Sequence, residues 1–302
     1  AVSLNLTVGI LGELSLGHAG FMCVGAFTSA VFTKCMMHTI TVPTVRFLLA
    51  LLIGVVCAGI CGVLIGIPVL RLRGDYLAIV TLAFGEIIKN LVNVIYLGRD
   101  SAGFHFSMKD IMALNMEPDG EVIIKGAQGI TGAPTDSNFT LGIILLLITL
   151  FIVLNLIHSR DGRAIMAIRD NTIAAESVGI HITKYKLMAF SISAALAGVA
   201  GVLYAHNLST LTALPKNFGY NMSIMILVFV VLGGIGNIRG SIIASVILTL
   251  LPELLRGLND YRMLIYSIVL IVMMLFNWAP KCIEWREKVA ARFKKSVKKE
   301  AE

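Results

Sequence analysis

The sequence predicts an all-α fold, a polytopic helical membrane protein with about eight to nine transmembrane helices and glycine-rich breaks. Of its 302 residues, 57% are hydrophobic and only 14% are charged, a composition far from that of soluble domains. Long stretches such as Phe139 to Ile157 contain no charged residue. Because a bilayer core of ~30 Å needs about 20 apolar helical residues, we expect one transmembrane domain over residues 1–302.

Each expected span is an apolar stretch that ends near basic residues or in a glycine-rich turn. Arg46 and Arg71 bracket one such stretch, and Lys186 and Lys216 bracket another. The first stretch is short for a span, so we expect that a preceding helix is missing from this sequence. In chain order the expected spans cover residues 1–13, 19–37, 46–70, 76–97, 139–158, 187–207, 219–237, 240–257 and 262–279.

The distribution of Lys and Arg predicts the orientation of these spans. The tail 280–302 carries eight basic residues and the 159–186 segment carries five, so both are expected in the cytoplasm. Counting spans back from the tail places the 98–138 segment outside, where six acidic residues outnumber three basic ones. A segment of that length is expected to be ordered or functional.

The composition also argues against several kinds of function. The net charge of +7 lies at the ends of apolar stretches and in the tail, which fits membrane topology better than a nucleic-acid-binding face. The five cysteines lack the spacing of a zinc site, and the sequence has no P-loop and no catalytic triad motif. We therefore expect no cofactor, metal or catalytic residue on this chain. The basic tail fits a membrane-surface anchor, or alternatively a partner-binding segment.

The first candidate for a translocation path is the glycine-rich motif from Ser15 to Phe21. Gly17 and Gly20 can interrupt a helix around His18, and irregular backbone at membrane depth is tolerated where it lines a cavity. A helix that restarts near Ala19 would direct amide groups toward a passing carboxylate. Alternatively, these glycines only allow helices to pack closely.

A second candidate lies in the 76–97 span. Thr81 and Gly85 are four residues apart and share a helix face, and Glu86 is an ionisable residue inside an apolar stretch. We place the path beside this face and the Gly17–Gly20 motif. The alternative for Glu86 is a local ion pair with Lys89, three residues further on.

The 159–186 segment has the pattern of two short cytoplasmic helices. Arg163 to Arg169 is amphipathic, and Asn171 and Thr172 can cap a second helix that ends at a left-handed Gly179. Such a segment is suited to docking a partner. The residues expected to couple this chain to the partner are Ile168, Arg169, Ala174, Ala175, Glu176 and Gly179.

The last motif is a glycine-rich turn between two expected spans. Its spacing is GxGxxxG without a surrounding strand–helix–strand unit, so a dinucleotide-binding loop is excluded. A tight cytoplasmic turn between closely packed helices is favoured. Its glycines are Gly233, Gly234, Gly236 and Gly240.

Together these motifs resemble the LivM-type permease subunit of the bacterial branched-chain amino-acid ABC transporter family, over nearly the whole chain. The cytoplasmic segment is similar to the coupling loop of importer permeases, E-A-A-x-x-x-G, with Ile173 in place of the Glu. The motifs that carry the resemblance are Ser15–Ala19, Gly66–Leu82, Phe84–Ile88, Gly162–Ala164, Ala167–Asn171, Ala174–Glu176, Gly179–Ile180 and Gly233–Gly240.

This resemblance implies a permease of the bacterial plasma (inner) membrane that translocates Leu, Ile and Val. The implied partners are a second related permease, two ABC ATPase subunits that bind ATP and Mg, and an extracytoplasmic amino-acid-binding protein. Urea, an amide or another amino acid is an alternative cargo. An ion-coupled secondary transporter is a different class, for which only Glu86 offers a carboxylate well inside a span.

Overall fold

The computed structural model describes residues 1–37, 39–72, 74–100, 103–116, 120–255, 264–265 and 267–272. By its internal contacts the chain divides into two compact units. The first is Val2–Leu227, and the second is Val228–Glu302 together with Ala1. The basic tail 280–302 lies outside the described residues.

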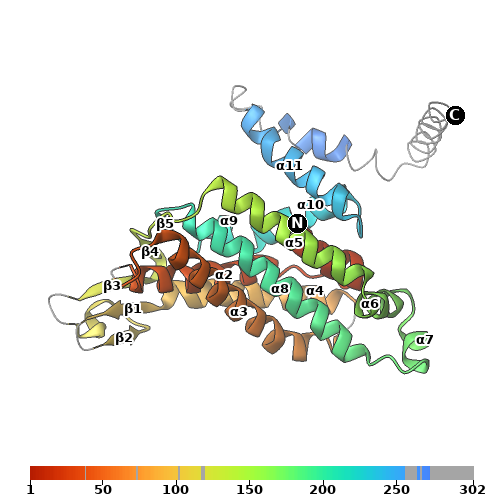
Figure 1. Ribbon diagram of the computed structural model, residues 1–302, viewed down its shortest axis with the longest axis horizontal. Coiled ribbons are helices and arrows are strands. Elements are labelled where there is room, and N and C mark those ends of the chain that lie inside the picture. The colour runs from red at the N-terminus through yellow and green to blue at the C-terminus, as the bar shows by residue number, and fades with distance from the viewer. Residues whose placement is uncertain are drawn as a thin grey trace. The chain divides into compact units, whose positions relative to one another are not determined.

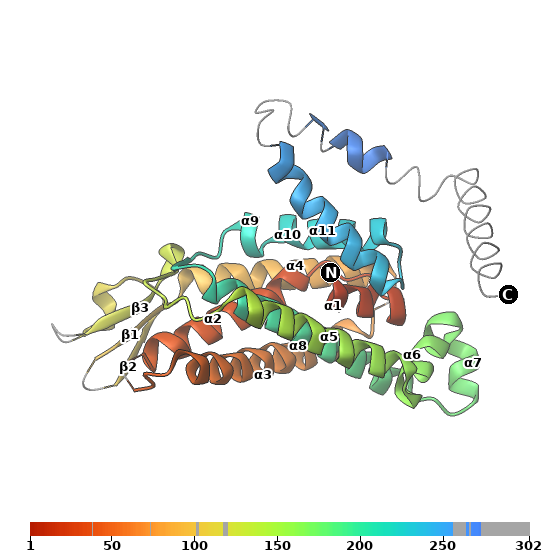
Figure 2. The ribbon, with the colours of Figure 1, turned by 45° about the horizontal axis from the view of Figure 1, so that its top comes forward.

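The first unit is a bundle of helices with a small β lobe at one end and two short helices, α6 and α7, at the other (Figures 1 and 2). Its first helix changes from α to π geometry, and its last helix continues into the second unit. The helices are α1 Val2–Asn5, the π-helix η1 Leu6–Leu11, α2 His18–Cys35, α3 Pro43–Val69, α4 Asp75–Val94, α5 Phe139–His158, α6 Arg160–Asp170, α7 Thr172–Ser177, α8 Ile182–His206, α9 Pro215–Phe218 and α10 Tyr220–Gly233.

The predicted class, a helical membrane protein, is confirmed. Among the described residues, five helical stretches are long and apolar enough to cross a membrane, namely α3, α4, α5, α8 and Pro215–Gly233. The shorter Val2–Leu11 is also apolar. The count of eight to nine spans stays a prediction, and the expected span 262–279 lies largely outside the described residues.

The core of the first unit is formed by α2, α3 and α8. These helices approach one another closely at small residues. A Cβ atom on Gly25 would lie 2.6 Å from the Cα of Gly198, and a Cβ on Gly198 would lie 2.6 Å from the Cβ of Ala58. In a bilayer the hydrophobic effect does not drive helices together, so close packing at small residues stabilises their association. Helix α5 is much less buried than these three helices, since Val153 is its only buried residue.

The described parts of the 98–138 segment contain β structure that the sequence pattern did not predict. Three strands, β1 Tyr96–Arg99, β2 Phe104–Ser107 and β3 Glu121–Lys125, form an antiparallel sheet in the order β2-β1-β3, with Tyr96 opposite both Ser107 and Lys125. Two short strands follow as a pair, β4 Ile130–Thr131 with β5 Thr210–Leu211. The sheet lies at the opposite end of the bundle from α6 and α7 (Figure 2).

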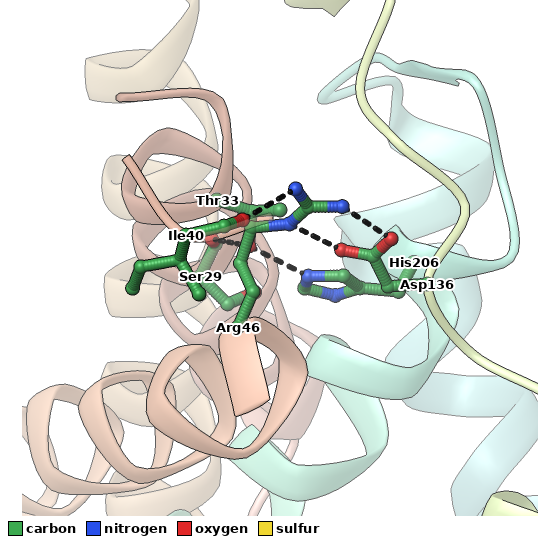
Figure 3. A network of polar contacts seen from close by, with 6 residues as sticks. All are labelled: Ser29, Thr33, Ile40, Arg46, Asp136 and His206. Atoms are coloured by element: carbon green, nitrogen blue, oxygen red, sulfur yellow. Dashed lines mark hydrogen bonds and ion pairs between the residues drawn. The ribbon is translucent and has the colours of Figure 1, made fainter. Parts of the chain in front are cut away.

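A buried polar network holds the helix ends together on the side of the β lobe (Figure 3). The guanidinium of Arg46 donates two hydrogen bonds to Asp136, at 2.7 and 2.6 Å, and a third to the carbonyl of Ile40 at 3.1 Å. His206 lies 2.9 Å from the hydroxyl of Thr33. Arg46 and Asp136 are both largely buried, so this bidentate pair fixes the 132–138 segment against α3.

The second unit contains the end of α10 and helix α11 Ile238–Leu254. Leu232, Ala244 and Leu248 form its apolar cluster. The turn between the two helices has Gly234 and Gly236 in left-handed conformations, at φ 93° and 82°. Asn237 caps α11 by accepting the amide of Gly240 at 3.2 Å.

We predict that Gly198→Leu destabilises the protein by about 2–3 kcal/mol, because the side chain would overlap Ala58 in a core without space. The matched control is Gly142→Leu in α5, where a Cβ would meet no atom within 4 Å. Thermal unfolding in detergent should show a lower Tm for Gly198→Leu alone. Equal Tm values for the two variants would contradict this account of the core.

Candidate functional site

The glycine-rich motif forms a true helix break that packs against α4. Helix η1 ends at Leu11, α2 begins at His18, and the amide of Leu16 between them donates to the hydroxyl of Thr81 at 3.1 Å. A Cβ on Gly17 would overlap the Thr81 carbonyl. The structure therefore brings the two path candidates into contact.

Gly20 meets Gly85 in the same contact, since a Cβ on Gly20 would lie 2.7 Å from the Cα of Gly85. Close packing alone accounts for glycine at both positions. The structure thus contains the close helix packing that was the alternative explanation for these glycines. Their role in a translocation path stays a prediction.

His18 belongs to a buried group of hydroxyl-bearing residues around the break. Its Nε2 lies 3.0 Å from the Ser3 hydroxyl and 3.4 Å from the Ser193 hydroxyl, and Thr7 donates to Ser193 at 2.7 Å. Within the described chain, His18 Nδ1 and the hydroxyl of Ser15 are buried without a hydrogen-bond partner. Unsatisfied buried polar atoms mark a place for water or for a polar solute group.

The sequence analysis did not select Ser3, Thr7 or Ser193. One signal was available in the first stretch, where Ser3 and Thr7 are four residues apart and so share a helix face. Ser193 could not have been found this way, because its partners come from segments distant in the sequence.

Glu86 forms the expected ion pair with Lys89 and a second contact that the sequence did not predict. Its other carboxylate oxygen accepts the amide of Tyr220, the first residue of α10, at 2.7 Å. Helices α9 and α10 are interrupted at Gly219, which makes this a second break in an apolar helix. Glu86 therefore caps a helix that begins 134 residues away.

The two helices that start at these breaks also contact each other. The amide of Ala19, in the first turn of α2, donates to the hydroxyl of Ser223, in the first turn of α10, at 3.1 Å. Two positive helix ends thus lie together beside α4. This arrangement is the kind that receives the carboxylate of a substrate in transporters with broken helices.

The predicted coupling segment, residues 159–186, contains α6 and α7 with the caps that the sequence indicates. Asn171 accepts the amides of Ile173 and Ala174 at 3.0 Å each, and Gly179 has a left-handed φ of 86°. The apolar side chains of Ile173 and Val178 are 81% and 75% exposed. These two residues, absent from the sequence-based selection, form the apolar surface of the segment.

The six predicted coupling residues have different surroundings. Ala174, Glu176 and Gly179 are exposed, whereas Ile168 and Ala175 are buried, at 2% and 3% exposure. The two buried residues support the segment from within and offer no surface to a partner. A helix of only six residues gives too little periodicity to predict its outer face.

Arg169 links the coupling segment to the first helix break. Its Nη1 donates to the carbonyl of Gly9 at 2.8 Å. Its side chain also packs against Gly12, where an added Cβ would lie 2.5 Å from the Arg169 Cγ. An ion pair between Glu13 and Lys186 fastens the same loop to α8. Helix α6 is therefore bonded directly to the segment that leads into the break.

At the second unit's turn, Gly233 and Gly240 are in close backbone contact. A Cβ on Gly233 would overlap Ser241, and one on Gly240 would overlap the carbonyl of Gly233. Glycine at these two positions permits α10 and α11 to meet at a tight turn.

This chain is similar to known permease sequences. The family model described as "Branched-chain amino acid transport system / permease component" matches residues 1–276. The "High-affinity branched-chain amino acid transport system permease protein LivM" of Salmonella typhimurium and that of Escherichia coli are each 34% identical over 93% of this chain. This chain spans 65% of the length of those two relatives.

The permease protein LivH of Salmonella typhimurium is 23% identical and covers 91% of this chain, with 87% of its own length matched. No solved structure matches the chain.

We predict that Glu86→Ala destabilises the protein by about 3 kcal/mol, because it leaves the Lys89 cation and the Tyr220 amide unpaired. The double variant Glu86→Gln/Lys89→Met should lose much less, since it keeps an amide acceptor and removes the cation. Thermal unfolding in detergent measures both. A double variant as unstable as Glu86→Ala would contradict this account, because it leaves neither a cation nor the Tyr220 amide unpaired.

Proposed function

The chain belongs to the family of permease components of branched-chain amino acid transport systems, and we propose that it translocates Leu, Ile and Val in an ATP-driven importer. The identity to LivM over 93% of the chain is the observation that carries this proposal. The chain would act in a bacterial plasma membrane with its C-terminus in the cytoplasm. Its proposed partners are a second related permease, two ABC ATPases that hold ATP and Mg, and an extracytoplasmic binding protein.

The proposed path lies where the helix starts of α2 and α10 meet α4. A branched-chain amino acid is a zwitterion with an aliphatic side chain, so it needs dipoles for its charged ends and an otherwise apolar route. The buried hydroxyls near His18 and the helix amides near Ala19 supply such dipoles. The residues assigned to the path are Gly17, His18, Gly20, Thr81, Gly85 and Glu86.

The proposed coupling surface is the exposed part of α7. Ile173 and Val178 would enter an apolar groove on an ATPase subunit, and Arg169 would transmit its movement to the first helix break. The buried Ile168 and Ala175 keep the segment rigid during that movement.

The test is reconstitution of this chain in liposomes with the permease, ATPases and binding protein encoded beside it. We expect ATP-dependent uptake of leucine, isoleucine and valine that persists when a protonophore abolishes ion gradients. Uptake of urea in place of these amino acids would contradict the proposed cargo. Uptake that needs an ion gradient and no ATPase would contradict the assignment to ATP-driven importers.

We predict that Ile173→Lys abolishes ATP-driven uptake without loss of folded protein, because this side chain is 81% exposed and a charge there stays in contact with water. Ile173→Val, which keeps an apolar surface, should retain most of the uptake. Gly179→Val should also uncouple transport, since a β-branched residue is strained at φ 86°. Full uptake by Ile173→Lys would exclude α7 from ATPase contact.

We predict opposite accessibility for the two ends of the first unit. In a variant without the five native cysteines, a cysteine at the 92% exposed Met112 should react with an impermeant thiol reagent in intact cells. A cysteine at Ile173 should react only after the membrane is opened. The reverse pattern would invert the proposed topology.

A further inference from the structure

A cavity of about 930 Å³ lies behind the coupling segment in the first unit. Its walls come from the loop after η1, the turn between α3 and α4, helices α6 and α7, and the start of α8. Neither the path residues near Thr81 nor the exposed Val178 line it. The cavity is therefore distinct from the proposed path, and it shares Ile173 with the exposed surface of α7.

Most charged groups in this cavity already have partners. Lys186 pairs with Glu13, and Arg169 is bonded to the Gly9 carbonyl and to Asp170. The side chains of Arg71 and Glu176 remain: both residues are exposed, and neither side chain forms a hydrogen bond or ion pair with a described residue. One positive and one negative side chain thus line the same cavity from different elements, the α3–α4 turn and α7.

The other lining residues are six aliphatic ones and six that are glycine, threonine or histidine. Leu70, Ile173 and Ile180 contribute branched side chains beside these charges. A lone carboxylate or phosphate would leave Glu176 unpaired, and an amine would leave Arg71 unpaired. A zwitterionic amino acid with a branched aliphatic side chain satisfies both charges and the apolar wall.

We propose that this cavity binds a branched-chain amino acid from the cytoplasm and that the bound molecule inhibits ATP-driven transport. Its carboxylate is held by Arg71 and its ammonium group by Glu176. The ligand thereby joins the α3–α4 turn to α7 and opposes the movement of α7 that coupling requires. This inference rests on the proposed function, because it takes α7 as the element that moves with the ATPase.

The experiment uses the complete transport complex in proteoliposomes with its ATPase side outward, so that the solution represents the cytoplasm. Labelled leucine and the binding protein are enclosed in the lumen. Unlabelled leucine in the outer solution should lower both ATP hydrolysis and release of label. Two analogues that lack one charge, 4-methylpentanoate and 3-methylbutylamine, should inhibit at least about ten-fold more weakly, because each leaves one charged residue unpaired.

Arg71→Gln tests the site without touching the path or the docking face. We expect transport without outer leucine to be unchanged, and the half-inhibitory leucine concentration to rise about ten-fold or more. The matched control is Arg160→Gln, an exposed arginine of the same cytoplasmic face that does not line the cavity. Its inhibition by leucine should equal that of the unmodified complex.

The outcomes separate this inference from the proposed function. A complex that transports leucine but is not inhibited by outer leucine overturns the inference alone. Equal inhibition by leucine and 4-methylpentanoate also overturns it, because the cavity would then bind an anion such as a lipid headgroup. If the folded complex transports no branched-chain amino acid, the proposed function itself fails.

Discussion

In a membrane core a helix can begin only where some group accepts its free amide hydrogens, and α4 supplies such acceptors at both breaks of this chain. Thr81 accepts the amide of Leu16 before α2, and Glu86 accepts the amide of Tyr220 at the start of α10. Water cannot replace these bonds in hydrocarbon, where an unsatisfied amide costs several kcal/mol. The position of α4 therefore determines where both broken segments lie, and the glycines at this contact follow from the close approach.

Helices α6 and α7 are connected to the first break by hydrogen bonds and packing contacts. Arg169 holds the Gly9 carbonyl, and the helix that contains Gly9 carries Ser3, which contacts His18 at the start of α2. Each step joins packed or hydrogen-bonded groups, so a displacement of α6 has a physical route to the break. The π geometry of Leu6–Leu11 on this route is itself a feature that often occurs at functional sites.

Local sequence patterns predicted the spans, the helix breaks and the caps of the coupling segment because each depends on neighbouring residues. Composition gave the membrane class, glycine density indicated the break before α2, and Asn171 indicated a helix start. The partners of Glu86 and Arg169 could not be predicted, since they lie 134 and 160 residues away in the chain. The β sheet was missed because its strands have only four or five residues, too few for a clear alternation.

The distribution of charge differs between the surroundings of the first helix break and the cavity beside α7. Around the break, the buried groups that a solute could meet are mainly hydroxyls and amides, and Glu86 is already paired with Lys89. Dipoles of this kind lower the barrier for a zwitterion without creating a deep well that would slow its release. Selectivity in such a system must come from a separate binding step, which the proposed extracytoplasmic partner supplies. The unpaired side chains of Arg71 and Glu176 line the cavity beside α7, so the proposed ionic recognition of an amino acid lies there and not at the helix break.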